Sequence, residues 1–191
     1  VDRVNRRHHR TGDEALTWAI TEFNAKGGPQ VHTWGNGQMF GAIYGIAMQH
    51  GAFTAATWSM YENGGNRKGT DFSFLDGKDH TPRPTYWHMQ LVSRYFSGHY
   101  VAADSPAKGL IVYGADDGKR LAVMLLNVSD QPVAFALGHD RRPSAVRDEV
   151  PVRLASPRPA SDHRGQLGPR STRVLLFENG QVRLFADDHT P

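Results

Sequence analysis

The sequence of 191 residues predicts an α/β portion over residues 1–98, followed by an all-β portion over residues 99–191. In the first portion, helix-spaced apolar residues alternate with short β-favouring runs, which is typical of βα units with parallel strands. From about residue 99 the hydrophobic period changes to two and turn signals separate the runs. This second pattern is typical of a small antiparallel β-sandwich.

The α/β portion is expected to begin with a helix and a strand. Residues 1–10 are predicted to be the end of an amphipathic helix, with Val1 and Val4 on its apolar side. A strand of the buried type follows over 16–23, because its aromatic and aliphatic side chains do not alternate with polar ones. The sequence Ala25-Lys26-Gly27-Gly28-Pro29 then predicts a turn.

A helix is predicted over residues 36–50, with Asn36 as its N-cap and Gly51 as the residue that ends it. Two glycines inside this helix, Gly41 and Gly45, lower its intrinsic stability by about 1 kcal/mol each relative to Ala. Their spacing of four residues places them on one face. We therefore expect that face to pack closely against a sheet.

A second short strand is predicted over 52–58, and a loop rich in Gly, Asn and Asp follows over 59–80. The next helix is expected to be capped by Thr81 and to carry two prolines in its first turn, where proline costs little. Aromatic and aliphatic residues recur at helical spacing to about residue 97, and Gly98 is expected to close the helix.

The all-β portion contains six strand candidates, at 110–113, 121–126, 133–137, 150–154, 174–177 and 182–185. Turn signals such as Asp116-Asp117-Gly118 separate several of them. The segment 155–170 is rich in Pro, Ser, Arg and Gly, and it is predicted to be a flexible surface loop.

Composition excludes several classes of protein. The formal charge is +3, but the basic residues are scattered, so no nucleic-acid partner is expected. No apolar run is long enough to span a bilayer, so no membrane partner is expected either. The absence of Cys excludes disulfides and Cys-ligated metals. The first residues lack an initiating Met and a signal-peptide pattern, which indicates a processed or truncated chain and leaves localisation unknown.

The strand over 16–23 carries a carboxylate, Glu22, near its carboxyl end. Ionised carboxylates are rarely buried without partners, so this residue is expected either to be paired for structural reasons or to meet a substrate. The carboxyl ends of strands are also where α/β barrels and open α/β sheets place their chemistry. Position alone leaves both interpretations of Glu22 open.

Three short sequences and the terminal β portion together resemble a known architecture. They are Trp18-Ala19-Ile20-Thr21-Glu22-Phe23-Asn24, Thr57-Trp58-Ser59 and Pro82-Arg83-Pro84-Thr85-Tyr86. They are similar to the last two βα units of a clan A glycoside hydrolase, a (β/α)8 barrel followed by a β-sandwich. Within that clan the similarity is to the family 39 xylosidase-like enzymes and to related families with a Thr-Glu-Phe-Asn strand. The resemblance implies a secreted or periplasmic protein.

The resemblance implies that Glu22 is the nucleophile of a retaining glycosidase and that Trp58 forms part of the floor of a sugar subsite. Such an enzyme needs a second carboxylic acid about 5–5.5 Å from the nucleophile, and it needs no metal or organic cofactor. The acid/base glutamate of the clan follows an Asn on strand four, which lies outside this sequence. Glu62 is the nearby carboxylate that could take its place, but we expect it to be a rim residue, which either is simply exposed to solvent or hydrogen-bonds a sugar hydroxyl.

Four further residues are candidates for sugar contacts. Asn24 either holds the loop after its strand or touches the sugar, and His32, Trp34 and Tyr61 either line a subsite or pack against the neighbouring helix. Asp71 and Asp76 are expected to shape their loop, since Asp bonds its own backbone in turns.

The expected partners are a carbohydrate substrate and the missing N-terminal part of the barrel, so the chain alone is expected to be inactive. The alternative function is a non-catalytic carbohydrate-binding module that stacks Trp34, Trp58 and Tyr61 on a polysaccharide.

Overall fold

The computed structural model of the chain describes residues 1–25, 28–62, 71–137 and 164–178, together with the backbone of 181–187. The α/β portion contains α1 (Asp2–Arg7), β1 (Ala19–Ile20), α2 (Trp34–Gln49), β2 (Thr54–Ala55) and α3 (Pro84–Tyr95), with short 3-10 helices at Gly12–Glu14 and Pro29–His32. The remaining strands are β3 (His99–Val101), β4 (Leu110–Asp116), β5 (Arg120–Asn127), β6 (Val133–Ala136), β7 (Arg164–Leu167), β8 (Thr172–Glu178) and β9 (Gln181–Asp187).

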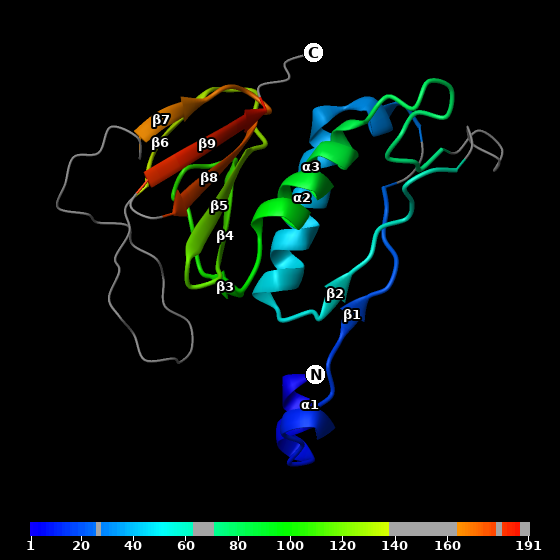
Figure 1. The fold of residues 1–191 in the computed structure, drawn as a ribbon, viewed down its shortest axis with the longest axis vertical. Coiled ribbons are helices and arrows are strands. Elements are labelled where there is room, and N and C mark those ends of the chain that lie inside the picture. The colour runs from blue at the N-terminus through cyan, green and yellow to red at the C-terminus, as the bar shows by residue number, and fades with distance from the viewer. Residues whose placement is uncertain (26–27, 63–70, 138–163, 179–180, 188–191) are drawn as a thin grey trace.

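The elements form layers around the pair of long helices (Figure 1). On one side of α2 and α3 lies a five-stranded antiparallel sheet in the order β3-β4-β5-β8-β9. On the other side lies the parallel pair β1-β2, and α1 projects from its lower end. Strands β6 and β7 form a separate antiparallel pair. The chain therefore mixes helices with parallel and antiparallel strands. None of the described helices is long and apolar enough to cross a bilayer.

Strands β1 and β2 pair in parallel, as the alternation of helices and strands predicts. Backbone hydrogen bonds extend this pairing beyond the regular strands, from Phe53 N to Trp18 O (3.0 Å) and from Trp58 N to Phe23 O (3.0 Å). The prediction of a buried strand is wrong, because Trp18 and Ile20 are half-buried and Leu16 is exposed. Within the described residues these two strands pair only with each other, so their outer edges have no neighbour.

Helix α2 begins at Trp34, two residues before the predicted start at residue 36. Its N-cap is Thr33, whose backbone is extended and whose hydroxyl accepts a hydrogen bond from Asn36 N (3.3 Å). The predicted N-cap, Asn36, is wrong because that residue is already helical and buried. At the other end Gly51 has a φ of +66°, a conformation that suits glycine after the last helical turn, as predicted.

One side of α2 carries three glycines, and residues of the five-stranded sheet and of α3 pack directly against it. A Cβ added to Gly45 would lie 2.2 Å from the Tyr113 ring, and one added to Gly41 would lie 3.3 Å from Met124 Sδ. The close packing against a sheet that was predicted for these two glycines is confirmed. Gly37, one turn earlier, meets α3 in the same way, with Pro84 O 2.6 Å from its added Cβ.

Replacing Gly45 with Ala is expected to lower the free energy of unfolding by about 1–3 kcal/mol, because the Tyr113 ring must move to admit a methyl group. Urea denaturation of the chain measures this change. The matched control is Gly35→Ala in the first turn of the same helix, where an added Cβ meets nothing within 4 Å. The control is expected to be neutral or to stabilise by up to about 1 kcal/mol. Equal stability of the two variants would contradict the close fit.

Helix α3 begins at Pro84, and Arg83 occupies its N-cap position without a side-chain capping bond. The predicted cap, Thr81, is wrong because Thr81 belongs to a turn of the preceding loop, where its carbonyl accepts a hydrogen bond from Asp76 N (2.9 Å). The helix ends at Tyr95, and Gly98 follows with a φ of +86°.

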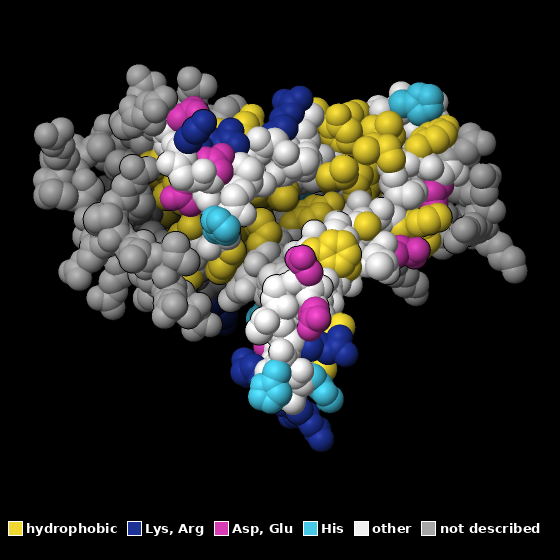
Figure 2. Space-filling model, turned by 60° about the horizontal axis from the view of Figure 1, so that its bottom comes forward, with side chains coloured by type: hydrophobic (Ala, Val, Ile, Leu, Met, Phe, Trp, Pro, Cys, Tyr) yellow, Lys and Arg dark blue, Asp and Glu magenta, His cyan; other side chains and the backbone are white. Residues whose placement is uncertain are grey.

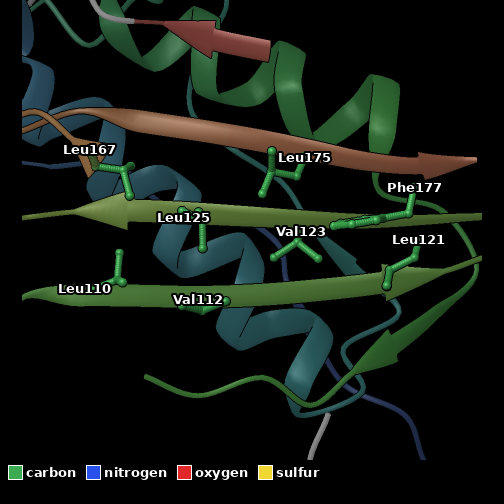
Figure 3. Close-up of a cluster of buried hydrophobic side chains, with 8 residues drawn as sticks. All are labelled: Leu110, Val112, Leu121, Val123, Leu125, Leu167, Leu175 and Phe177. Carbon is green, nitrogen blue, oxygen red and sulfur yellow. The ribbon is translucent and has the colours of Figure 1, made fainter. Parts of the chain in front are cut away.

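The central strand β5 is buried on both faces, which explains its continuous apolar sequence. One face packs on the helices, through the buried residues Tyr113, Ala122, Met124, Leu126, Val174 and Leu176, against which Leu91, Val92, Tyr95 and Phe96 lie. The other face forms the cluster of Figure 3, made of Leu110, Val112, Leu121, Val123, Leu125, Leu167, Leu175 and Phe177. Val133 and Phe135 of β6 pack against that second cluster.

Five of the six strand candidates lie in β4, β5, β6, β8 and β9, and the sixth, 150–154, falls outside the described residues. Strands β3 and β7 were not predicted. The prediction of a flexible loop over 155–170 is wrong for residues 164–167, which form β7, and residues 155–163 are not described. Leu167 anchors β7 because its side chain is fully buried in the core.

Candidate functional site

The candidate site lies where the chain leaves the carboxyl ends of β1 and β2. Asn24 ties these two exits together, because its side-chain amide donates hydrogen bonds to Trp58 O and to Phe72 O (3.0 Å). Its Oδ1 accepts a hydrogen bond from Ala25 N (2.6 Å). Asn24 therefore fixes the loop after β1 against the two segments that follow β2.

Helix α2 packs against the segments that follow β1 and β2. The Phe23 ring packs against Phe40 (5.0 Å between centroids) and Tyr44 (5.6 Å). Burial raises the pKa of Tyr44, and a hydrogen bond with the Thr57 side chain partly offsets that rise. Tyr44 is thus neutral at physiological pH, and one helix holds the residues that precede both Asn24 and Trp58.

Glu22 is exposed at this end of the parallel pair. Within the described part of the chain, no ion pair or hydrogen bond involves its carboxylate. The neighbouring Phe23 is packed into the molecule, so the backbone that carries Glu22 is held while its carboxylate faces solvent. A carboxylate in this position is accessible to a ligand.

Trp58 presents part of its indole to solvent, with 37% of the residue exposed. Its Nε1 donates a hydrogen bond to Glu62 Oε1, and the other carboxylate oxygen of Glu62 accepts one from Phe72 N (2.9 Å). Ser73 Oγ accepts a further bond from Glu62 N (2.6 Å). Both carboxylate oxygens of Glu62 thus have protein partners, and they fix the orientation of the indole. The Trp58–Ser59 peptide bond is cis.

The loop that precedes α3 is built around Arg83, which is 5% exposed. Its Nη2 donates to Asp71 Oδ2 (2.6 Å) and Asp76 Oδ2 (3.2 Å), and its Nη1 donates to Ser73 O (2.8 Å). Burial opposes ionisation of Asp71, but hydrogen bonds from Arg83 and Ser73 outweigh it and lower its pKa. Bonds from Lys78 N and Arg83 lower the pKa of Asp76. The loop-shaping role predicted for the two aspartates is confirmed.

The other candidate residues lie in different surroundings. His32 is exposed and lines a pocket of about 310 Å³ beside the loop that precedes α3. Trp34 is half-buried and packs against His88 of α3, with ring centroids 4.7 Å apart. Tyr61 is 41% exposed, and its ring lies 5.1 Å from that of His80. The structure thus gathers Asn24, Trp58 and Glu62 into one hydrogen-bonded group, whereas Trp34 belongs to the helix pair.

Sequence reasoning missed Arg83 as the centre of this loop. Its signal is a single arginine flanked by prolines after a loop that contains Asp71, Asp76 and Asp79. Among the residues that the structure describes, no group of three His, Asp or Glu side chains is arranged to hold a metal ion. The described residues thus include an exposed carboxylate at Glu22 and, across the backbone bond between Trp58 and Phe23, an indole that Glu62 holds in place.

No family model matches the sequence, and no curated protein matches it. Among solved structures, the fold is similar to that of the glycoside hydrolase family 30 subfamily 8 xylanase Xyn30A from Clostridium acetobutylicum, with a TM-score of 0.58 and 14% identity over 86% of this chain and 43% of that one. It is also similar to a family 30 endoxylanase from Clostridium papyrosolvens C71, with a TM-score of 0.55 and 14% identity over 83% of this chain and 41% of that one. A family 86 β-porphyranase from Bacteroides plebeius matches with a TM-score of 0.45 and 15% identity, over 92% of this chain and 37% of that one.

The chain spans about two fifths of the length of the two xylanases. At this level of identity the similarity is one of fold. It shows that the chain shares its fold with part of these two xylanases, and the relation to clan A and to family 39 stays a prediction.

Proposed function

We propose that the chain is part of a retaining glycoside hydrolase in which Glu22 is the nucleophile. In this proposal residues 1–98 provide the last two βα units of a (β/α)8 barrel, and residues 99–191 provide a β-sandwich. The observation that carries the proposal is the exposed Glu22 carboxylate at the carboxyl end of a parallel strand, one residue from the backbone bond that joins Phe23 to Trp58. The fold similarity to two xylanases supports it.

The proposed chemistry assigns a distinct task to each residue of the site. The ionised Glu22 attacks the anomeric carbon, and a carboxylic acid from another part of the enzyme protonates the leaving oxygen. Water then releases the sugar with its original anomeric configuration, and no cofactor takes part. The Trp58 indole lies against the apolar face of the pyranose, while Asn24 and Glu62 hold the backbone and the ring in place.

The proposed partner of β1 and β2 is the remainder of the barrel. Two parallel strands leave both outer edges open, and such edges pair readily with further strands. Large exposed hydrophobic residues flank these strands, namely Leu16, Phe53, Trp58 and Met60, and Ile46 is exposed on α2. Figure 2 shows hydrophobic side chains gathered on the side from which α1 projects. Phe53, the residue before β2, is 70% exposed, as expected for a side chain that packs against a part of the barrel outside this sequence. A secreted or periplasmic location belongs to the same proposal.

The test compares the chain of 191 residues with a complete enzyme in which it is joined to the rest of a barrel. The chain alone is expected to leave aryl glycosides intact, and the complete enzyme is expected to hydrolyse them with retention of configuration. Turnover by the chain alone that survives Glu22→Gln would overturn the proposal. Polysaccharide binding that Trp58→Ala abolishes, without hydrolysis by the complete enzyme, would instead favour a carbohydrate-binding module.

Replacing Glu62 with Ala in the complete enzyme is expected to raise KM about fivefold, because the indole is no longer held in its binding orientation and fixing it on binding costs about 1 kcal/mol. We expect kcat to change less than KM, since Glu62 touches Trp58 rather than the reacting atoms. Steady-state kinetics measure both constants, and tryptophan fluorescence reports the freed indole. The exposed Glu14, in the 3-10 helix before β1, provides the control Glu14→Ala. A KM equal to that of this control would show that Trp58 does not depend on Glu62.

A further inference from the structure

A polar pocket of about 310 Å³ lies between the 3-10 helix Pro29–His32 and the loop that precedes α3. It is lined by His32, Asp76, Asp79, Thr81, Pro82, Arg83 and Pro84. The pocket adjoins the aromatic residues that follow β2, because His80, which packs against the exposed Tyr61, stands between Asp79 and Thr81 in the same turn. Its volume is at the low end for small-molecule sites, which suits one monosaccharide unit.

The pocket presents hydrogen-bond acceptors on one side and an imidazole on another. Asp76 and Asp79 each use one carboxylate oxygen to accept a backbone bond, from Lys78 N (2.9 Å) and Thr81 N (2.9 Å) respectively. These bonds lower the pKa of both carboxyls, so both are ionised at neutral pH. His32 faces Asp76 closely enough for the two side chains to interact electrostatically.

Arg83 adds a fixed positive charge to the wall of the pocket. It lines the pocket although it is 5% exposed, and its Nε is buried without a hydrogen-bond partner among the described atoms. The rest of this side chain is held rigidly at the wall of the pocket. The other guanidinium nitrogens are used by Asp71, Asp76 and Ser73, which keeps the group in place.

The chemistry of these groups selects the class of ligand. Two ionised carboxylates disfavour an anion, and the polar lining disfavours an apolar molecule. The described residues do not form a metal-binding group here. A hydroxyl group suits the pocket because it donates to a carboxylate and also accepts from an imidazole or a guanidinium. Vicinal sugar hydroxyls provide several such groups on one rigid ring.

We propose that the pocket around His32, Asp79 and Arg83 is a sugar-binding subsite distal to Glu22, which binds the hydroxyls of a second unit of an oligosaccharide or polysaccharide. The inference rests on the proposed function, because it takes the ligand to be a carbohydrate. It goes further by predicting that the enzyme binds a chain of sugars across Trp58, Tyr61 and this pocket, rather than a single terminal unit.

The test titrates the chain of 191 residues with xylohexaose, cellohexaose and neoagarohexaose and measures affinity by calorimetry. At least one hexasaccharide is expected to bind, and both His32→Ala and Asp79→Asn are expected to weaken that binding about tenfold. Asp79→Asn keeps one side-chain oxygen as the acceptor for Thr81 N and removes the negative charge, so we expect the loop to be retained. The exposed Asp13 provides the control Asp13→Asn, and circular dichroism verifies that each variant is folded.

The outcome separates the two proposals. The distal subsite would be overturned if none of the three hexasaccharides binds. It would also be overturned if both pocket variants bind as tightly as the unmodified chain. In the complete enzyme the pocket variants are expected to raise KM for a hexasaccharide and to leave hydrolysis of an aryl monoglycoside unchanged, since that substrate does not reach the pocket. Failure of Glu22→Gln to reduce monoglycoside hydrolysis would overturn the nucleophile assignment and would leave the binding result standing.

Discussion

Replacing Glu22 with Gln in the complete enzyme is expected to lower kcat by at least roughly 10³-fold, because an amide cannot form the covalent glycosyl intermediate. We expect substrate affinity to change much less than kcat, since Gln has nearly the same shape and Trp58 retains its contacts. Hydrolysis of an aryl glycoside measures the loss. The control is Glu14→Gln, which changes an exposed carboxylate before β1 and is expected to be silent.

A second variant tests the role of Glu22 rather than its importance. Glu22→Gly opens space for a small anion, and azide is expected to restore turnover by attacking the anomeric carbon from the side that the carboxylate occupied. The product is then a glycosyl azide with the configuration opposite to that of the substrate, because one displacement has replaced two. A decrease smaller than tenfold for Glu22→Gln, or a glycosyl azide with retained configuration, would contradict the nucleophile assignment.

The free energy of unfolding of the chain is expected to fall by about 3 kcal/mol as pH is lowered from 6.5 to 4, because over this range His88 takes up a proton in the unfolded chain while it stays largely neutral in the folded one. Its Nδ1 lies 2.7 Å from Pro84 O, and its Nε2 lies 2.8 Å from Thr172 Oγ1. A carbonyl oxygen can only accept, so Nδ1 carries the proton and the Thr172 hydroxyl donates to Nε2. The neutral ring therefore satisfies both of its nitrogens, and it joins α3 to β8.

The sign of the pH effect follows from the pKa of His88, which complete burial lowers from 6.5 to about 4. In the unfolded chain the imidazole takes up a proton near pH 6.5, whereas in the folded chain it does so only near pH 4. Lowering the pH through this range therefore stabilises the unfolded state relative to the folded state. The lowered pKa values of Asp71 and Asp76 act in a separate range below about pH 4, where those carboxylates gain protons on unfolding. The contribution of the neutral His88 to the free energy of unfolding is thus fully present above pH 6.5, and it is lost as the pH falls from 6.5 to 4.

Urea denaturation at several pH values between 7.5 and 4.5 measures this slope. In His88→Gln the slope over this range is expected to disappear even though the variant is less stable at pH 7.5, since no titrating group remains at the position. His8→Gln, a change at an exposed histidine after α1, is expected to keep the wild-type slope. A flat profile for the unmodified chain would show that the buried imidazole is not linked to folding.

The features that sequence predicted correctly are those that depend on local pattern. Helices α2 and α3 follow from helical spacing of apolar residues, and the close approach at Gly41 and Gly45 follows from their spacing. The carboxyl ends of both parallel strands were predicted to carry the unusual residues, and the structure pairs Trp58 with the extended segment that follows β1 and contains Glu22. These predictions need only the period of each element and the direction of its chain.

The features that sequence did not predict depend on contacts between distant segments. Thr33 replaces Asn36 as the N-cap because the preceding 3-10 helix extends the helical region toward the N-terminus. Strand β7 was missed because Arg164-Gly165-Gln166-Leu167 has one apolar side chain, whose burial requires β5 and β8. Arg83 was missed for a related reason, since its partners are brought together only when the loop folds.

The fit of Tyr113 and Met124 into the glycine side of α2 has a consequence for engineering chimeras of this protein. A foreign β-domain grafted after residue 98 would bring its own side chains to a helix surface that is shaped for these two. Such a graft is therefore expected to succeed when the donor domain is redesigned at the positions of Tyr113 and Met124, and not when the linker alone is adjusted.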